Sequence, residues 1–536
     1  MFLRVKRGGN TQNPHDYLQV VESYRDNGRP KQRVLLTLGR LDRLQESGQI
    51  DRLTDALARF SLTRRVFDAS QVKSCKSRSW GPTLVFERLW KQQNLPAILQ
   101  GLAQDRRFQF DVERVAFALA LQRLCRPGSD LEGIRWIPTV EAEGFEQIEL
   151  QHLYRTVRFL GEVRQPLEKE LFFHDRDLFH LEIDLLFLDT TSVYTYSQEE
   201  TEFRRRGYSR DRRAELPQMI LCVAVDRHGW PVAWEILPGN TADKPAMAKM
   251  VAALRQRFQI RRVIVVADRG MVSAKMIQLL TGDATSPYDY ILGCRMRRQK
   301  EVTEEVLARA GRYHKVAKNL DVKEVWVEDR RYVVCRNPQV ATKDAASRAS
   351  ILEKLEVKLS QGPKALMGNK GYARFLKVKK SSVEIDPKAV EADQRLDGKF
   401  VLRTNTDLPA EEVALAYKSL WRVERTFREE KSTLEVRPIY HQSDENCIGH
   451  IVASFLALRL EVDLQKRLSA KEVEASWPQI MSDLEQIQAV HLDLESQTWR
   501  VRTDLCGAAY AAFQAAGVRP PPRVEALSQG PRNVVP

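Results

Sequence analysis

Two short apolar runs, each followed by an aspartate, constrain the fold of this chain most strongly. Residues 185–188 read LLFL and residues 263–267 read VIVVA. A strand with one face in water alternates apolar and polar residues, whereas a strand covered on both faces is apolar throughout. Both runs are therefore expected to be buried strands, and each is expected to end at its aspartate, Asp189 or Asp268.

The segments around these runs predict the rest of a sheet. Residues 217–225 and 230–236 flank the turn DRHG and indicate an antiparallel hairpin. Residues 243–259 have the apolar spacing of a helix, and a second, shorter helix follows Asp268. Strands and helices in this order predict an α/β fold with a mixed sheet and flanking helices.

With 536 residues, the chain is too long for one core, so several domains are expected. Shifts in pattern and composition divide it into a small β unit with a helix (1–70), a helical and possible DNA-binding region (80–180), the first part of the sheet domain (181–294), a β-rich insertion (295–405), the second part of the sheet domain (406–470), and C-terminal helices with a loose tail (471–536).

Charge and composition limit which binding partners and which metal ligands are expected. The net charge is +14, which suits a polyanion such as nucleic acid, although a merely basic soluble protein fits equally well. The seven cysteines form no C-x-x-C and the nine histidines no finger spacing, so carboxylates holding Mg²⁺ or Mn²⁺ are the expected metal site. The sequence has no signal-peptide pattern and no apolar run of membrane-spanning length, so a cytoplasmic protein is expected.

A third carboxylate lies in a segment that predicts one helix over residues 409–434. On a helical projection, Tyr417, Glu424 and Lys431 share one stripe, beside an apolar stripe that includes Phe427. Glu424 is therefore expected at the edge of the core, where a carboxylate needs a cation or a metal as partner. An ordinary amphipathic helix with a charged wet face is the alternative.

Together, Asp189, Asp268 and Glu424 predict a carboxylate site at the sheet edge. Ligand sites in open α/β sheets gather at strand ends. Two carboxylates about 4 Å apart repel by about 4 kcal/mol in a partly buried site, and two divalent ions would relieve that repulsion. Taken singly, each aspartate is more simply explained as a turn residue that follows a strand.

The motifs around these residues resemble a known family. They are LDTT around Asp189, the loop at 207–218, PGNTAD at 238–243, ADRGM at 267–271, and LWRVERTFREEKSTLEVRPIYH at 420–441. The chain is similar over about 180–460 to DDE transposases of bacterial insertion sequences, in the group with a Tyr-Arg-Glu-Lys signature. This resemblance implies an RNase H-like catalytic domain interrupted by a β-rich insertion.

The resemblance also implies roles for residues. Asp189, Asp268 and Glu424 would bind two Mg²⁺ or Mn²⁺ ions and carry out the catalysis. Tyr417 and Lys431 fit the signature and would contact DNA. Leu420 stands where the signature has Arg, so the phosphate contact is expected from Arg428 or, less well placed on the helix, Arg422. Apart from the resemblance, the basic loop at 204–213 adjoins Asp189, so Arg210 and Arg212 are expected to contact the DNA backbone.

The implied activity is cleavage at the ends of an insertion sequence and joining of the freed 3′-hydroxyls to target DNA. The implied partners are double-stranded DNA and a second copy of the chain, and a bacterial cytoplasmic protein of this kind would associate with the nucleoid. Two alternatives are a transposase-derived DNA-binding protein that does not cut, and a tyrosine recombinase. The latter rests only on the H-x-x-R pattern formed by His152 and Arg155.

Overall fold

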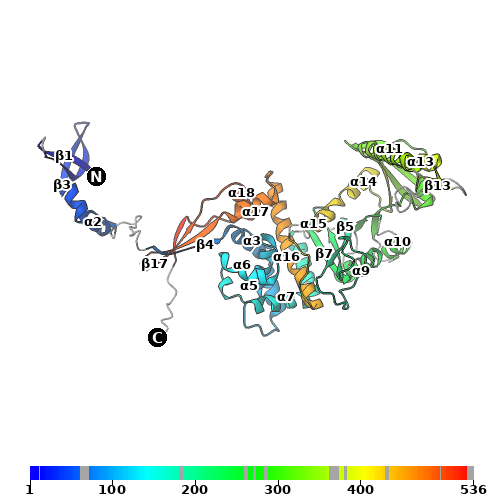
Figure 1. The fold of residues 1–536 in the computed structure, drawn as a ribbon, viewed down its shortest axis with the longest axis horizontal. Coiled ribbons are helices and arrows are strands. Elements are labelled where there is room, and N and C mark those ends of the chain that lie inside the picture. The colour runs from blue at the N-terminus through cyan, green and yellow to red at the C-terminus, as the bar shows by residue number, and fades with distance from the viewer. Residues whose placement is uncertain are drawn as a thin grey trace. The chain divides into compact units, whose positions relative to one another are not determined.

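The computed structural model (Figure 1) describes residues 1–10, 13–58, 60, 72–179, 185–258, 263–269, 273–282, 288–360, 374–378, 383–428, 434–494 and 497–527. The chain forms two compact units. The first comprises residues 1–77, 490–502 and 522–536, and the second comprises residues 78–489 and 503–521.

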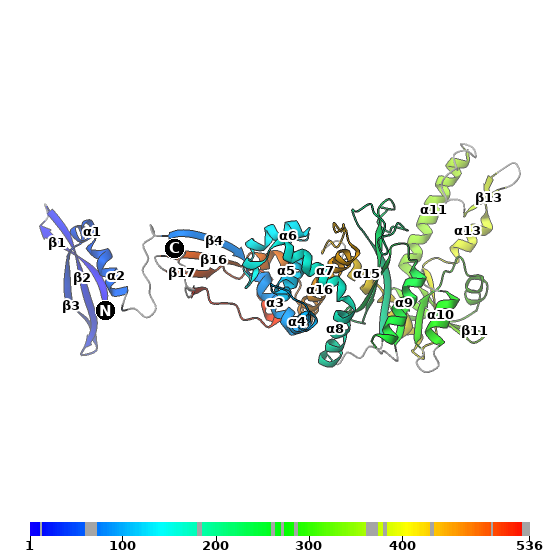
Figure 2. The ribbon, with the colours of Figure 1, turned by 90° about the horizontal axis from the view of Figure 1, so that it is seen from below.

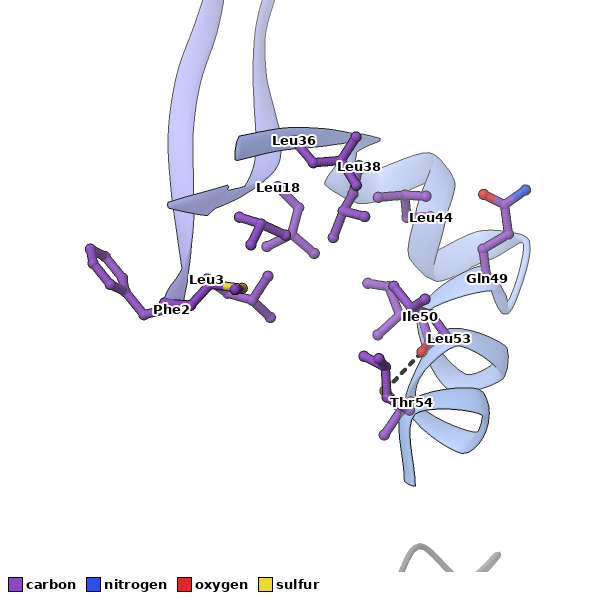
Figure 3. A pocket seen from close by; sticks show the side chains of 13 residues that line it. Phe2, Leu3, Leu18, Leu36, Leu38, Leu44, Gln49, Ile50, Leu53 and Thr54 are labelled. Atoms are coloured by element: carbon purple, nitrogen blue, oxygen red, sulfur yellow. Dashed lines mark hydrogen bonds between the residues drawn. The ribbon is translucent and has the colours of Figure 1, made fainter. Parts of the chain in front are cut away.

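The first unit begins with an antiparallel three-stranded sheet and two short helices. Its elements are β1 (Phe2–Asn10), β2 (Asn13–Asp26), β3 (Arg29–Arg40), α1 (Leu41–Glu46) and α2 (Gln49–Ala58). Figure 3 shows Leu18, Leu36 and Leu38 of the strands facing Ile50 and Leu53 of α2 across an apolar cavity of about 610 Å³. Alternation along β2 and β3 places these leucines on one face.

A four-stranded sheet, formed by one strand at residues 72–79 and three C-terminal strands, differs from the sequence prediction. Its order is β18-β17-β16-β4, with β4 (Val72–Ser79), β16 (Gln488–Leu494), β17 (Gln497–Arg502) and β18 (Val524–Leu527). We expected only helices and a loose tail over 471–536, and the helices α17 (Trp477–Glu485) and α18 (Ala509–Ala516) do occur there. The period-two patterns of HLDL and TWRVR, which we did not interpret as strands, account for the difference.

The second unit contains a large mixed sheet with helices on both faces, which confirms the predicted α/β class (Figures 1 and 2). Its central strands are β5 (Leu185–Tyr194), β6 (Gln218–Val225), β7 (Pro231–Pro238), β8 (Ile264–Ala267) and β9 (Asp289–Gly293). The strands β5, β6 and β7 pair antiparallel, whereas β8 lies parallel to both β5 and β9. The arrangement is consistent with an RNase H-like fold.

Four strands of the segment expected as a β-rich insertion, residues 295–405, extend this sheet. The full order is β10-β11-β12-β15-β9-β8-β5-β6-β7. Antiparallel pairing of Leu402 with Gly293 joins β15 to β9, so the edge of β9 is covered. The elements of this segment are η4 (Val302–Val306), β10 (His314–Ala317), β11 (Leu320–Val327), β12 (Arg330–Arg336), α11 (Pro338–Ser360), β13 (Leu376–Val378), β14 (Val383–Ile385), α13 (Pro387–Gln394) and β15 (Lys399–Thr404).

Each face of the sheet has its own layer of helices. Phe187 and Val193 of β5 pack in one core with α14 (Ala410–Lys418), α15 (Trp421–Arg428) and α16 (Asp444–Ala470). Leu186 and Leu188 pack in another core with α9 (Asp243–Gln256) and α10 (Ala274–Thr281). Figure 2 shows the strands between α15 and α9. By strand alternation, Asp189 belongs to the face that α15 covers.

A helical region packs around α16. Its elements are α3 (Gly81–Gln92), α4 (Leu95–Ala103), α5 (Val112–Cys125), α6 (Asp130–Trp136), η2 (Ile137–Thr139), η3 (Phe145–Gln147), α7 (Leu150–Glu162) and α8 (Arg164–Phe179). The helices α7 and α16 approach each other so closely that a Cβ at Gly449 would lie 1.7 Å from the Val157 carbonyl oxygen. Glycine therefore permits this contact. Among the described residues, no helix is long and apolar enough to cross a membrane.

A buried ion pair joins the helical region to the sheet. Arg459 of α16 donates two hydrogen bonds of 2.9 Å to the Asp175 carboxylate of α8, and Trp230, just before β7, donates to the same carboxylate at 2.9 Å. The Arg459 and Asp175 side chains are only 2% and 4% exposed. Because each charge lacks access to water, each depends on the other for neutralisation.

We predict that Asp175→Ala lowers the free energy of unfolding of this unit by about 3–5 kcal/mol, because it leaves the Arg459 guanidinium buried and unpaired. Urea unfolding measures the change. The control is Arg158→Ala, which removes a pair with Glu162 whose arginine is 65% exposed and should cost less than about 1 kcal/mol. Equal losses in the two variants would contradict the prediction.

Candidate functional site

The register of the parallel strands places Asp189 beside Asp268. The last paired residues of β5 and β8 are Leu188 and Ala267, and the two aspartates follow directly on neighbouring strands. Asp268 comes after the end of β8, as predicted. Asp189 does not end its strand, which corrects our expectation: β5 continues to Tyr194 because the antiparallel partner β6 extends beyond the end of β8.

Asp189 is a carboxylate held in a mostly dry environment. Its side chain is 20% exposed, and this burial raises its pKa to about 6. The Arg210 guanidinium, with Nη1 3.6 Å from Oδ1, and the Thr190 backbone N–H, which donates at 2.7 Å, both act to lower the pKa. The negative charges of Asp243 and Asp268 act to raise the pKa of Asp189, so the three carboxylates interact electrostatically.

Asp243 is a member of this group that the sequence interpretation missed. The Arg210 guanidinium bridges Asp189 to Asp243, with Nη2 3.2 Å from Asp243 Oδ1. The Thr190 hydroxyl donates to the same Asp243 oxygen at 2.7 Å and accepts from Arg210 at 2.8 Å. Asp243 ends the motif PGNTAD, which we had noted without assigning a role to the aspartate. Arg210, which was predicted to bind DNA, thus forms ion pairs with the carboxylates of Asp189 and Asp243.

Asp268 has a different partner, the phenol of Tyr417. Its Oδ1 accepts a hydrogen bond of 2.7 Å from the Tyr417 hydroxyl. Burial and the Asp268 charge raise the pKa of Tyr417, so the phenol stays a donor. The ring stacks on Phe400 with centroids 5.7 Å apart, and a Cβ added at Gly293 would lie 2.4 Å from the hydroxyl oxygen. Tyr417, predicted as a DNA contact, is therefore held against Asp268.

The predicted single helix over 409–434 is wrong. The structure has α14 and α15, separated at Ser419 and Leu420. The Ser419 hydroxyl donates to the Leu415 carbonyl at 3.1 Å, and the Leu420 N–H bonds to the Tyr417 carbonyl three residues back, which tightens the turn. The angular relation that we drew from Tyr417 to Glu424 therefore does not hold.

Glu424 is exposed rather than held at the edge of the core, which is a second correction. Helix α15 packs on the sheet through Val423 and Phe427, and these side chains are 0% and 6% exposed. Glu424 is adjacent to Val423 but points to solvent. The apolar stripe was thus identified correctly, whereas the position of the carboxylate relative to it was not.

The other predicted DNA contacts lie on the surface or outside the description. Arg428 is exposed at the end of α15, and Arg212 is exposed in the basic loop with a positive φ of 59°. Lys431 and the side chain of Arg422 lie outside the described residues.

Two ion pairs tie the basic loop to the segment after α15. The buried Arg204 guanidinium donates to Asp444 at 3.0 Å, and Asp211 pairs with Arg437. Ile439 also bridges to Thr195, next to the end of β5. The motifs around Asp189 and after Glu424, distant in sequence, therefore lie together.

Two of the carboxylates have the oxygen ligands that a divalent metal prefers. Carboxylate oxygens suit Mg²⁺ and Mn²⁺, and Asp189 and Asp268 supply them on neighbouring strands. In the described ranges, however, no three His, Cys, Asp or Glu side chains are grouped so that they could hold a metal ion. Glu424 does not complete the pair, so the arrangement as it stands does not fit the expected three-carboxylate site.

Comparison with protein families gives two matches. Residues 180–460, slightly more than half of the chain, match the model of the transposase DDE domain. Residues 3–66 match the model of the N-terminal domain of IS1634 family transposases. No curated protein matches the chain.

We predict that Asp189→Asn stabilises the metal-free protein at pH 8 and about half as much at pH 5. Because burial raises the pKa of Asp189 to about 6, the native state favours the protonated acid, and stability is lost as the pH rises through that value. The gain at pH 8 is at most about 3 kcal/mol. Thermal unfolding in EDTA measures it, with the exposed Asp407→Asn as a control expected to show no change. Destabilisation at both pH values would contradict the prediction.

We predict that Gly293→Ala destabilises the protein by about 1–3 kcal/mol, because the added methyl group collides with the Tyr417 hydroxyl. The matched control is Gly311→Ala, where a Cβ would make an ordinary contact of 3.5 Å with Lys323. In a Tyr417→Phe background the cost at Gly293 should shrink, since the colliding oxygen is gone. If Gly293→Ala lowered the stability equally in both backgrounds, the added methyl group would collide with a group other than the Tyr417 hydroxyl, and the prediction would be contradicted.

Proposed function

The chain belongs to the family of transposases with a DDE domain, and from this premise we propose that it cuts the ends of its insertion sequence and joins the freed 3′-hydroxyls to target DNA. The observation that carries the proposal is the side-by-side placement of Asp189 and Asp268 at the end of the β5–β8 pairing. Both carboxylates lie where the parallel pairing of two central strands ends, and a phosphodiester could approach them there.

We further propose that Asp189, Asp268 and Glu424 act together with Mg²⁺ or Mn²⁺, two ions being expected. When bound, such ions stabilise the negative charge that develops on phosphodiester oxygens. The proposal requires Glu424 to move toward the aspartates. The helix α15 packs on the same face of the sheet to which Asp189 belongs, so the proposed movement would take place on one face of the sheet.

The chain's own residues hold the two aspartates before any such change. Arg210 contacts Asp189 and Asp243 and offsets part of their negative charge, and the Tyr417 hydroxyl fixes one oxygen of Asp268. In the proposed reaction Arg210 would leave the carboxylates to contact a DNA phosphate, since a guanidinium binds a phosphate as readily as a carboxylate. Arg212 and Arg428, both exposed, would add backbone contacts.

The proposal extends to fold and partners. We propose that the sheet domain is RNase H-like and that residues 295–405 are an insertion whose strands continue the sheet. Double-stranded element ends and target DNA are the proposed substrates. A homodimer on DNA, in a nucleoid-associated cytoplasmic protein, is the proposed working form.

A transposase-derived DNA-binding protein without cleavage activity remains the second candidate, favoured by the exposure of Glu424. The recombinase alternative has no support from the family match, and its two residues both contact the ring of Phe110. The His152 ring stacks on Phe110 at 4.2 Å, and the Arg155 guanidinium lies 5.2 Å from the centre of the same ring.

We predict that Asp189→Asn, Asp268→Asn and Glu424→Gln each abolish metal-dependent cutting of plasmid that carries the DNA flanking this gene, while DNA binding survives. The assay compares Mg²⁺, Mn²⁺ and EDTA. The matched control is Glu412→Gln, an exposed carboxylate on α14 that should retain full activity. Binding without cutting by the wild-type protein would favour the second candidate, and cutting by Glu424→Gln would remove Glu424 from the site.

A further inference from the structure

A basic cavity of about 460 Å³ lies next to Asp268 and Tyr417. Five cationic side chains belong to residues that line it, against the single carboxylate of Asp268. They are Arg269, Arg295, Arg297, Arg298 and Lys399. Like charges brought this close repel one another, so their grouping favours an anionic ligand.

A fixed turn after β9 presents three of these arginines. The Cys294 N–H bonds to the Val401 carbonyl of β15 at 2.8 Å, which anchors the start of the turn on the sheet. The Arg298 N–H bonds to the Arg295 carbonyl at 2.9 Å, and the Gln299 side chain accepts from the Arg295 N–H at 3.1 Å. The turn thus has internal hydrogen bonds that fix its backbone, from which its basic residues line the cavity.

The cations differ in how far they are neutralised. Arg297 pairs with Asp393 at 2.9 Å, and Arg295 donates from Nε to the Arg269 carbonyl at 2.9 Å. Lys399 donates to the Arg395 carbonyl at 2.8 Å. Within the part of the chain that the structure describes, neither Arg269 nor Arg298 makes an ion pair with a carboxylate, and both are exposed. These two guanidinium groups are the ones most available to a ligand.

The arginine side chains that line the cavity determine which kind of anion it can bind. Guanidinium groups bind phosphate oxygens through paired N–H donors and recognise no base in doing so. Tyr417 lines the cavity and also donates its hydroxyl hydrogen bond to Asp268, so the cavity lies directly beside that carboxylate. A DNA strand with one phosphodiester at Asp268 would therefore place its neighbouring phosphate near the arginines.

We propose that this cavity is a DNA backbone site, in which Arg269 and Arg298 hold a phosphate next to the one at Asp268. The inference rests on the proposed function, since it assumes that DNA is the substrate at Asp268. It adds a binding site formed by the β9 turn and the start of β15, separate from the basic loop at 204–213 and from α15.

The test measures how DNA affinity depends on salt, in EDTA so that no cutting occurs. Each lost phosphate contact lowers the slope of log K against log salt by about 0.9. We expect this reduction for Arg269→Ala and for Arg298→Ala, on DNA of any sequence. Arg297→Ala should change the slope less, because Asp393 already neutralises that charge.

The matched control is Lys300→Ala, which removes one exposed charge two residues from Arg298 and outside the cavity lining. Slopes for Arg269→Ala and Arg298→Ala that equal the control would overturn the site. A reduction confined to one DNA sequence would also overturn it, since that indicates base recognition. Wild-type protein that binds DNA but never cuts would contradict the proposed function while leaving this result intact.

Discussion

The pairing of β5 with β8 is the constraint on which the site depends. Two parallel strands whose pairing ends at Leu188 and Ala267 necessarily bring the next residues, Asp189 and Asp268, side by side. Buried apolar side chains on both faces fix that register, because a slip of one residue would turn every side chain to the opposite face. The positions of the carboxylates are thus set by the most buried part of the sheet.

Close carboxylates need compensation, and each aspartate receives a different kind. Asp189 shares the Arg210 guanidinium with Asp243, whereas Asp268 accepts a hydrogen bond from Tyr417. A guanidinium on an exposed loop can leave when a competing ligand arrives, but the phenol is packed between Phe400 and Gly293. The Asp268 side of the site is therefore rigid, and the Asp189 side is the one that can rearrange.

The parts that could be predicted from the sequence are those that rest on local patterns. Continuous apolar runs indicated β5 and β8, and their aspartates marked the sheet edge. The apolar stripe of α15 was also predictable, because Val423 and Phe427 follow a helical period. Motif resemblance supplied the family, to which the chain belongs.

The parts that could not be predicted depend on contacts between distant segments or on one local hydrogen bond. The helix α14 ends at Lys418, where the Ser419 hydroxyl bonds to the Leu415 carbonyl, and a helical projection does not show such a bond. Asp243 joins the site only through Arg210 and Thr190, 33 and 53 residues away along the chain. The extension of the sheet by β15 likewise depends on its pairing with β9, which nothing in the local pattern specifies.

The proposed function requires that Glu424 on α15 joins Asp189 and Asp268 when the protein acts on DNA. Localised hydroxyl-radical cleavage by Fe²⁺ in place of Mg²⁺, mapped on the protein bound to its DNA ends, tests this most directly. We expect cuts in the chain near Asp189, near Asp268 and within α15, with the α15 cuts lost in Glu424→Gln. Cuts near the two aspartates with none in α15 would contradict this requirement.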